Sequence, residues 1–302
     1  MADAAARPIP RRCPSEGTIR RPRRGLAALA GTQGFRRATQ TAIAGFIAWL
    51  VVSRVEGSTS PEALCPFGGL ETLIGFATGG VFVPHVHLSN VVLAVAALLT
   101  AFAARGAFCG WLCPFGFLQD VVAGVARTLE AHVPTLRAAM RTLRRRGARL
   151  AILDRPLRLL KYLVLAWAVL GAAAFGVMVF RDVDPWSALL EIGRGSAGIG
   201  FVVLVGVIVA SFFVERAWCR YACPLGAATG LVSRFSPVRL ERIENACSSC
   251  GACSKACPMG IDLLAARRVT SQDCVGCLEC VEACPRAGAL ELRAGLPILS
   301  VS

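Results

Sequence analysis

The chain has 302 residues, of which 55% are hydrophobic and 17% are charged, and its mean hydropathy is +0.59. The formal net charge of +14 does not indicate a nucleic-acid partner, because the arginines flank apolar segments and no aromatic residues alternate with them as stacking platforms. We therefore exclude nucleic acid, and the composition predicts an α-helical membrane protein in contact with lipid.

By composition the chain divides into a basic tail, two apolar regions separated by a basic loop, and a cysteine-rich C-terminal ferredoxin domain. These five segments cover residues 1–37, 38–126, 127–157, 158–236 and 237–302. Four uncharged apolar stretches approach or reach the length that crosses a hydrocarbon core ~30 Å thick. They predict four transmembrane helices in a duplicated two-span repeat, at residues 38–53, 87–104, 162–180 and 197–214.

Arginine is concentrated in the tail and in the basic loop, and it is scarce in the loops at 54–86 and 181–196. Because Arg and Lys stay on the cytoplasmic side of short loops, we expect a multi-pass protein of the bacterial cytoplasmic membrane with both termini in the cytoplasm. The tail is too long and too rich in arginine for a cleaved signal peptide, so the first span is expected to remain.

The two outer loops carry candidate groups for redox or proton chemistry. Cys65 stands in a CPFGGLE motif, and Glu71 and Glu191 occupy matching positions in the two halves. An acid at membrane depth is costly enough to suggest proton acceptance, whereas a solvated loop acid needs no such role. His85 and His87 lie two residues apart, so they could bind a metal, accept a proton, or simply form an interfacial pair.

Each apolar region contains a C-x3-C-P motif. Cys109 and Cys113 lie in FCGWLCPFG, and Cys219 and Cys223 lie in WCRYACPLG. An i, i+4 spacing puts both sulfurs of a pair on one helical face, and a pseudo-twofold axis relating the repeats could bring the pairs together. The sequence leaves three interpretations open: a third iron–sulfur or metal site, a redox-active dithiol relay, or reduced structural cysteines.

The C-terminal segment contains two runs of the form C-x2-C-x2-C-x3-C-P, CSSCGACSKACP and CVGCLECVEACP, a pattern typical of proteins with two [4Fe–4S] clusters. In two-cluster ferredoxins the fourth cysteine of each run binds the other cluster. The predicted ligands of one cluster are Cys247, Cys250, Cys253 and Cys284. Those of the other are Cys274, Cys277, Cys280 and Cys257. Two zinc sites would show separated CxxC pairs instead.

In combination, these features resemble the NapH/MauN-type membrane ferredoxins over residues 38–290. That family shares its membrane core with the NosR regulators, whose flavin-binding domain we do not expect here. The resemblance implies an electron carrier subunit rather than an autonomous enzyme. It would couple the quinone pool or a cytoplasmic donor to a periplasmic redox enzyme system through a redox partner protein. The alternative is a maturation or regulatory factor that supplies electrons for cofactor assembly or activation of a periplasmic enzyme.

Overall fold

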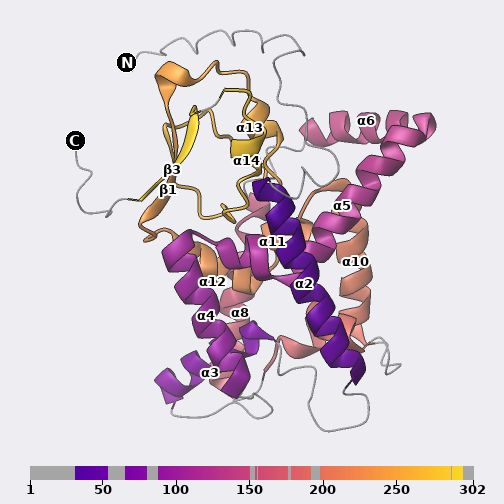
Figure 1. The fold of residues 1–302 in the computed structure, drawn as a ribbon. Helices are drawn as coiled ribbons and strands as arrows, with labels where there is room; N and C mark the ends of the chain where they lie inside the picture. The colour runs from indigo at the N-terminus through magenta and orange to yellow at the C-terminus, as the bar shows by residue number, and fades with distance from the viewer. Residues whose placement is uncertain are drawn as a thin grey trace, which may run out of the picture.

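The computed structural model describes residues 31–53, 65–79, 88–149, 154, 156–175, 178–191, 198–286 and 288–294. Helices make up the first part, and a small α+β unit follows (Figure 1). The longer helices are α2 (Thr32–Ser53), α3 (Pro66–Gly79), α4 (Leu88–Ala104), α5 (Pro114–His132), α6 (Pro134–Arg149), α8 (Leu160–Phe175), α10 (Ile199–Phe213) and α12 (Pro224–Ser233). Shorter helical turns are η3 (Phe108–Leu112), η4 (Arg181–Val183), α9 (Pro185–Glu191) and α11 (Ala217–Tyr221).

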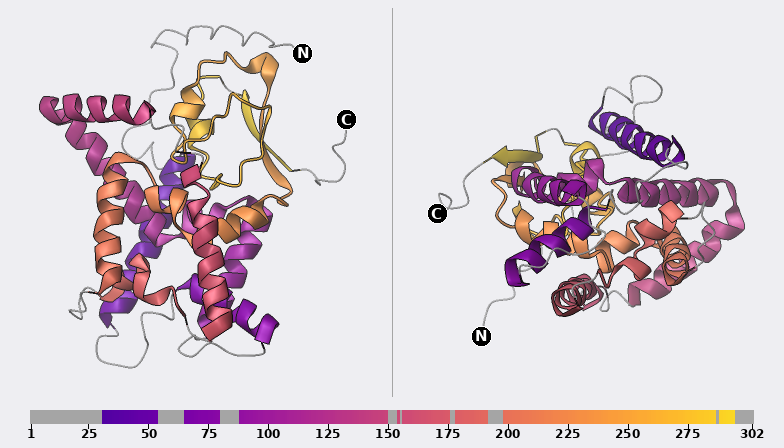
Figure 2. Two further views of the ribbon diagram at one scale, coloured as in Figure 1. Left: turned by 180° about the vertical axis from the view of Figure 1, so that it is seen from behind. Right: turned by 90° about the horizontal axis from the view of Figure 1, so that it is seen from below.

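Helices α3, α4, α8 and α12 pack against one another on one side of the helical part (Figure 2). Small side chains permit the close approach: α4 buries Ala94, Ala97 and Ala101, and α8 buries Ala168 and Ala172. These positions recur every three to four residues, which places them on one face of each helix.

On the other side, α10 packs against α5 and α9. Phe115, Leu204 and Val207 form the buried core of this contact. The outward faces of α8 and α10 expose large apolar side chains, for example Leu163 on α8 at 66% exposure and Val202 on α10 at 71%.

The C-terminal unit is built on a three-stranded antiparallel sheet in the order β2-β1-β3. Its elements are β1 (Val238–Arg242), η6 (Glu244–Ala246), α13 (Ala252–Lys255), β2 (Arg268–Val269), α14 (Glu279–Glu282) and β3 (Leu290–Ala294). Leu240 on β1 lies opposite Val269 on one side and Leu292 on the other. Leu240 and Val269 pack with Cys253 and Cys280, so the cysteine side chains form part of the core.

Direct hydrogen bonds join the C-terminal unit to the helical part. Trp111 Nε1 donates to the carbonyl oxygen of Gly276 at 3.0 Å, and Gln33 Nε2 donates to that of Cys277 at 2.6 Å. Both acceptors lie in the second ferredoxin run, so η3 and α2 hold the backbone of that run in place.

No helix in the described part of the chain is both long enough and apolar enough to cross a membrane. Helices α4, α8 and α10 have 17, 16 and 15 residues. At 1.5 Å per residue they measure ~25 Å or less, against a hydrocarbon core of ~30 Å. Helix α2 has 22 residues, but it includes the polar, buried Arg36 and Gln40. The prediction of an α-helical membrane protein with four transmembrane helices is therefore wrong, although each predicted stretch forms a helix.

We expect Gly110→Ala to destabilise the protein by about 1–3 kcal/mol, the usual cost of overpacking. A methyl group there would lie 2.2 Å from the carbonyl oxygen of Val275, so the ferredoxin run would have to move. Gly124→Ala is the matched control, because nothing lies within 4 Å of its added methyl group and the helix gains about 0.5–1 kcal/mol. Anaerobic thermal unfolding measures both variants, and equal melting temperatures would contradict the contact.

Candidate metal centres

Cys113 and Cys223 each cap the N-terminus of a helix. Their backbones are extended (φ −70°, ψ 114° and φ −69°, ψ 113°), as expected for a residue before proline. Cys113 Sγ accepts the backbone N–H of Gly116 at 3.4 Å, and Cys223 Sγ accepts that of Gly226 at 3.3 Å. The thiol thus takes the place of the usual oxygen at an N-cap.

This geometry differs from the predicted one, in which each pair of sulfurs shares one helical face. Cys109 lies in the π-helical turn η3, and Cys219 lies in α11. The chain leaves both turns at the second cysteine, and a new helix, rather than a loop, begins at the following proline. Proline favours this position because its missing N–H has no partner in the first turn of a helix.

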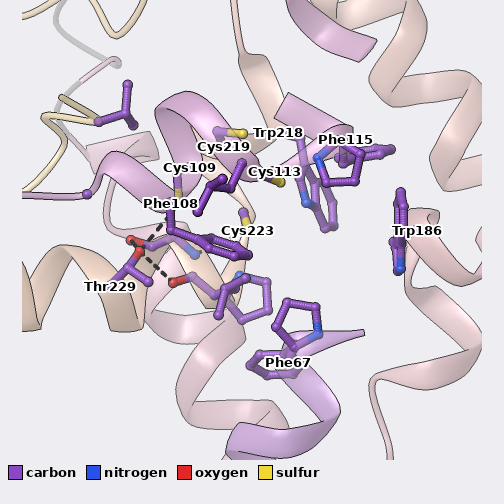
Figure 3. Close-up of a pocket in the computed structure, with 18 of the residues that line it drawn as sticks. Phe67, Phe108, Cys109, Cys113, Phe115, Trp186, Trp218, Cys219, Cys223 and Thr229 are labelled. Carbon is purple, nitrogen blue, oxygen red and sulfur yellow. Dashed lines mark hydrogen bonds between the residues drawn. The ribbon is translucent and has the colours of Figure 1, made fainter. Parts of the chain in front are cut away.

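The four cysteines of the C-x3-C-P motifs line one cavity of about 410 Å³ (Figure 3). We call Cys109, Cys113, Cys219 and Cys223 the CxxxCP set. Burial, and secondly the nearby Cys219, raises the pKa of the Cys109 thiol to about 11. Burial also raises the pKa of Cys223, followed by the effects of Cys219 and Cys109. The structure thus brings together the two pairs, which lie far apart in the sequence.

Each repeat contributes a polar side chain that contacts a cysteine of the other repeat. Gln119, six residues after Cys113, donates through Nε2 to Cys219 Sγ at 3.2 Å. Thr229, six residues after Cys223, has its Oγ1 3.6 Å from Cys109 Sγ. Each repeat therefore supplies a polar group to the first cysteine of the other. Neither residue was predicted from the sequence, although their equal spacing from the two cysteines was a usable signal.

A second cavity, of about 240 Å³, is lined by four cysteines drawn from both ferredoxin runs. We call Cys257, Cys274, Cys277 and Cys280 the second ferredoxin set. Burial raises the pKa of Cys280, and Cys277, Cys274 and Cys257 raise it further, in that order. The fourth cysteine of the first run thus lies among the first three of the second run.

The remaining ferredoxin cysteines make the reciprocal arrangement. We call Cys247, Cys250, Cys253 and Cys284 the first ferredoxin set. Burial raises the pKa of Cys284, and Cys247 and Cys250 contribute to the rise. Burial likewise raises the pKa of Cys253, with contributions from Cys284 and Cys247. Cys284 therefore lies with the first run rather than with its own.

These thiols suit iron–sulfur clusters better than single metal ions. In the described residues, no three His, Cys, Asp or Glu side chains lie close enough to hold one ion. A tetrahedral zinc site would need its sulfurs gathered about 2.3 Å from one centre. A cluster is held at its corners, so its ligands lie farther apart than those of a single ion. The described cysteines are free of disulfides, so all of these thiols are available as ligands.

The CxxxCP cavity has an acidic end. It is lined there by Cys65 and Asp184, and Cys65 Sγ donates to Asp184 Oδ2 at 3.6 Å. Burial raises the pKa of Asp184 to about 6. Nearby, Glu71 is fully buried, and its carboxylate oxygens have no hydrogen-bond partner among the described residues. Burial, and secondly Asp184, raises the pKa of Glu71 to about 8.

Of the other sequence candidates, Glu191 is the last residue of α9, and its side chain lies outside the described part of the structure. His85 and His87 lie outside the described residues.

Two family models match the chain. One, described as "4Fe-4S binding domain", matches residues 86–131 and 196–242, which contain both C-x3-C-P motifs. The other, described as "4Fe-4S dicluster domain", matches residues 239–285, which contain both ferredoxin runs. No solved structure matches the chain.

Several curated proteins are similar in sequence. The putative electron transport protein YccM of Escherichia coli is 32% identical over 237 residues, which cover 76% of this chain and 62% of that protein. The ferredoxin-type protein NapH of Haemophilus influenzae is 28% identical, over 66% of this chain and 67% of NapH. The methylamine utilization ferredoxin-type protein MauN of Paracoccus denitrificans is 36% identical, over 50% of this chain and 47% of MauN. The match to YccM thus spans less than two thirds of that relative.

Proposed function

We propose that this chain transfers single electrons through two [4Fe–4S] clusters in its C-terminal unit. The proposal is supported by the similarity of the chain to the NapH- and MauN-type ferredoxin-type proteins, which its motifs also predict. When bound, such clusters supply reversible one-electron transfer. The first and second ferredoxin sets would hold one cluster each. The observation that carries this proposal is that Cys257 lines a cavity with Cys274, Cys277 and Cys280.

Paired cysteine substitutions test this exchange of ligands between the runs. In Cys247→Ser/Cys284→Ser both changes fall in the first ferredoxin set, so we expect the loss of one cluster, or four irons per chain. In Cys247→Ser/Cys257→Ser the changes fall in different sets, so both clusters are damaged. Iron analysis and EPR of the anaerobically purified variants distinguish the two. The opposite order of iron loss would show that each run binds its own cluster.

The CxxxCP set supports a third iron–sulfur centre. All four of its thiols line one cavity, and each has a donor or a hydroxyl group within hydrogen-bond reach. Hydrogen bonds to sulfur stabilise the thiolate form that iron requires. These residues also lie within the segments that the 4Fe-4S binding domain model matches.

Serine at all four positions of the CxxxCP set should lower the bound iron by four per chain and leave the EPR signals of the other two clusters in place. Cys65→Ser is the matched control, since Cys65 lines the same cavity without belonging to the set. An unchanged iron content in the fourfold variant would rule out the third centre and favour structural cysteines.

We propose a quinol as the electron donor at this cavity. Aromatic side chains form much of its wall, and Phe115 packs edge-on against both Trp186 and Trp218, with ring centroids 6.5 Å apart (Figure 3). A planar, apolar head group suits such a wall. Oxidation of a quinol releases protons together with electrons, and Asp184 lines the same cavity as the thiols. The electrons would then pass to a redox partner protein of a respiratory or dehydrogenase system.

We expect reduction of the protein by a soluble quinol analogue to accelerate as the pH rises through about 6, the pKa of Asp184, because only the carboxylate form can accept a proton. Asp184→Asn should lower the rate at pH 7 by about a hundredfold and remove this pH dependence. Glu71→Gln should keep this pH dependence, because the raised pKa of Glu71 leaves its carboxyl group protonated below about pH 8. Anaerobic stopped-flow absorbance measures the rates, and an identical pH profile for Asp184→Asn would exclude this role.

A further inference from the structure

Arg216 combines two features that are each unfavourable for an arginine. Its side chain is completely buried, and its backbone is left-handed, with φ 52°, a region that non-glycine residues rarely adopt. It lies three residues before Cys219, between α10 and α11. A guanidinium is buried only where its charge is compensated and its donors are satisfied.

Asp120 compensates Arg216 directly. The Nε and Nη2 atoms of Arg216 donate to the two carboxylate oxygens of Asp120 at 2.7 Å each, and Nη1 donates to the carbonyl oxygen of Cys109 at 3.0 Å. Asp120 also accepts from Arg36 Nη2 at 2.5 Å, while Arg36 has a second carboxylate partner in Glu279 at 2.9 Å. Arg216 therefore relies on a carboxylate that it shares with another guanidinium, and that second guanidinium is also paired with Glu279.

The guanidinium of Arg216 lies beside residues of two cysteine sets. Its Nη1 atom donates to the backbone of Cys109, and a methyl group at the adjacent Gly110 would lie 3.5 Å from the backbone nitrogen of Cys277. Cys277 belongs to the second ferredoxin set, and it packs in one cluster with Cys109, Cys219 and Met259. The CxxxCP set and the second ferredoxin set are thus in contact, and Arg216 lies close enough to affect both.

The first ferredoxin set has a different environment. Cys253 and Cys284 pack in the core of the C-terminal unit, with Leu240, Val269 and Leu290 of its three strands. A charge that favours reduction at the CxxxCP set and the second ferredoxin set therefore changes the reduction potentials of those two centres relative to that of the first ferredoxin centre.

From this arrangement we infer that Arg216 is a positioning residue that raises the reduction potentials of the CxxxCP centre and the second ferredoxin centre together. Reduction adds a negative charge to a buried site, and a fixed cation nearby stabilises the reduced form, strongly so where water is excluded. Arg216 thereby sets the driving force between these two centres and the first ferredoxin centre. This inference rests on the proposed function.

Redox titration followed by EPR tests the role of Arg216. In Arg216→Met the ratio of reduced to oxidised second ferredoxin centre at a fixed applied potential should fall at least tenfold, which corresponds to 59 mV for one electron. Arg216→Lys keeps the charge, so the reduction potential of the second ferredoxin centre should stay close to the wild-type value. Arg220→Met is the matched control: Arg220 lies four residues later and is paired with Asp154 at 2.6 Å. An unchanged potential in Arg216→Met, or an equal shift in Arg220→Met, would overturn the inference.

A variant of opposite sign covers the case in which Arg216→Met fails to retain its clusters. Asp120→Asn keeps the shape of the side chain and removes the charge that compensates Arg216. At the same applied potential, the ratio of reduced to oxidised second ferredoxin centre should therefore rise at least tenfold. A fall or no change would overturn the inference. The second ferredoxin centre gives this readout even if the CxxxCP centre proves absent. Absence of the CxxxCP centre is detected independently, because the wild-type protein would then contain only two clusters.

Discussion

A proline that directly follows a cysteine restricts the backbone at two equivalent places in this chain. Before Pro114 and Pro224 the cysteine is excluded from the helical conformation, so one helical turn ends there and another helix begins at once. The sulfur is then held at the start of that helix, against a backbone N–H of its first turn. The positive end of the helix dipole also lies there, and it favours the thiolate form of Cys113 and Cys223. The convergence of the two repeats on one cavity depends on these two turns.

Burial and charge act in opposite directions throughout this region. Burial alone keeps the thiols protonated, as the raised pKa values of Cys109, Cys113 and Cys219 indicate. Arg216 opposes this effect at all three, and Lys161 does so at Cys109. Binding of metal ions to such thiols releases protons, so cluster insertion, local charge and folding are coupled. The buried cations Arg216 and Lys161 are therefore part of what these buried thiols require, together with the cysteines themselves.

The sequence was most informative where ligand chemistry imposes a fixed spacing. The ferredoxin runs and the C-x3-C-P repeat stand out without a structure, and each of the four apolar stretches forms a helix within a few residues of its predicted limits. Apolar composition was a poor guide to span length, because three of those helices end too early. The roles of Arg216, Asp120 and Gln119 follow from contacts between segments about a hundred residues apart, which no local pattern encodes.

The exchange of Gln119 and Thr229 between the repeats bears on how such a chain could arise. In each half, the polar group that contacts the first cysteine comes from the other half. A single ancestral half could complete this arrangement only by pairing with a second copy of itself about a twofold axis, with the same patch on both partners. Fusion of the two copies would preserve that symmetry while allowing the halves to diverge, as the glutamine in one and the threonine in the other illustrate.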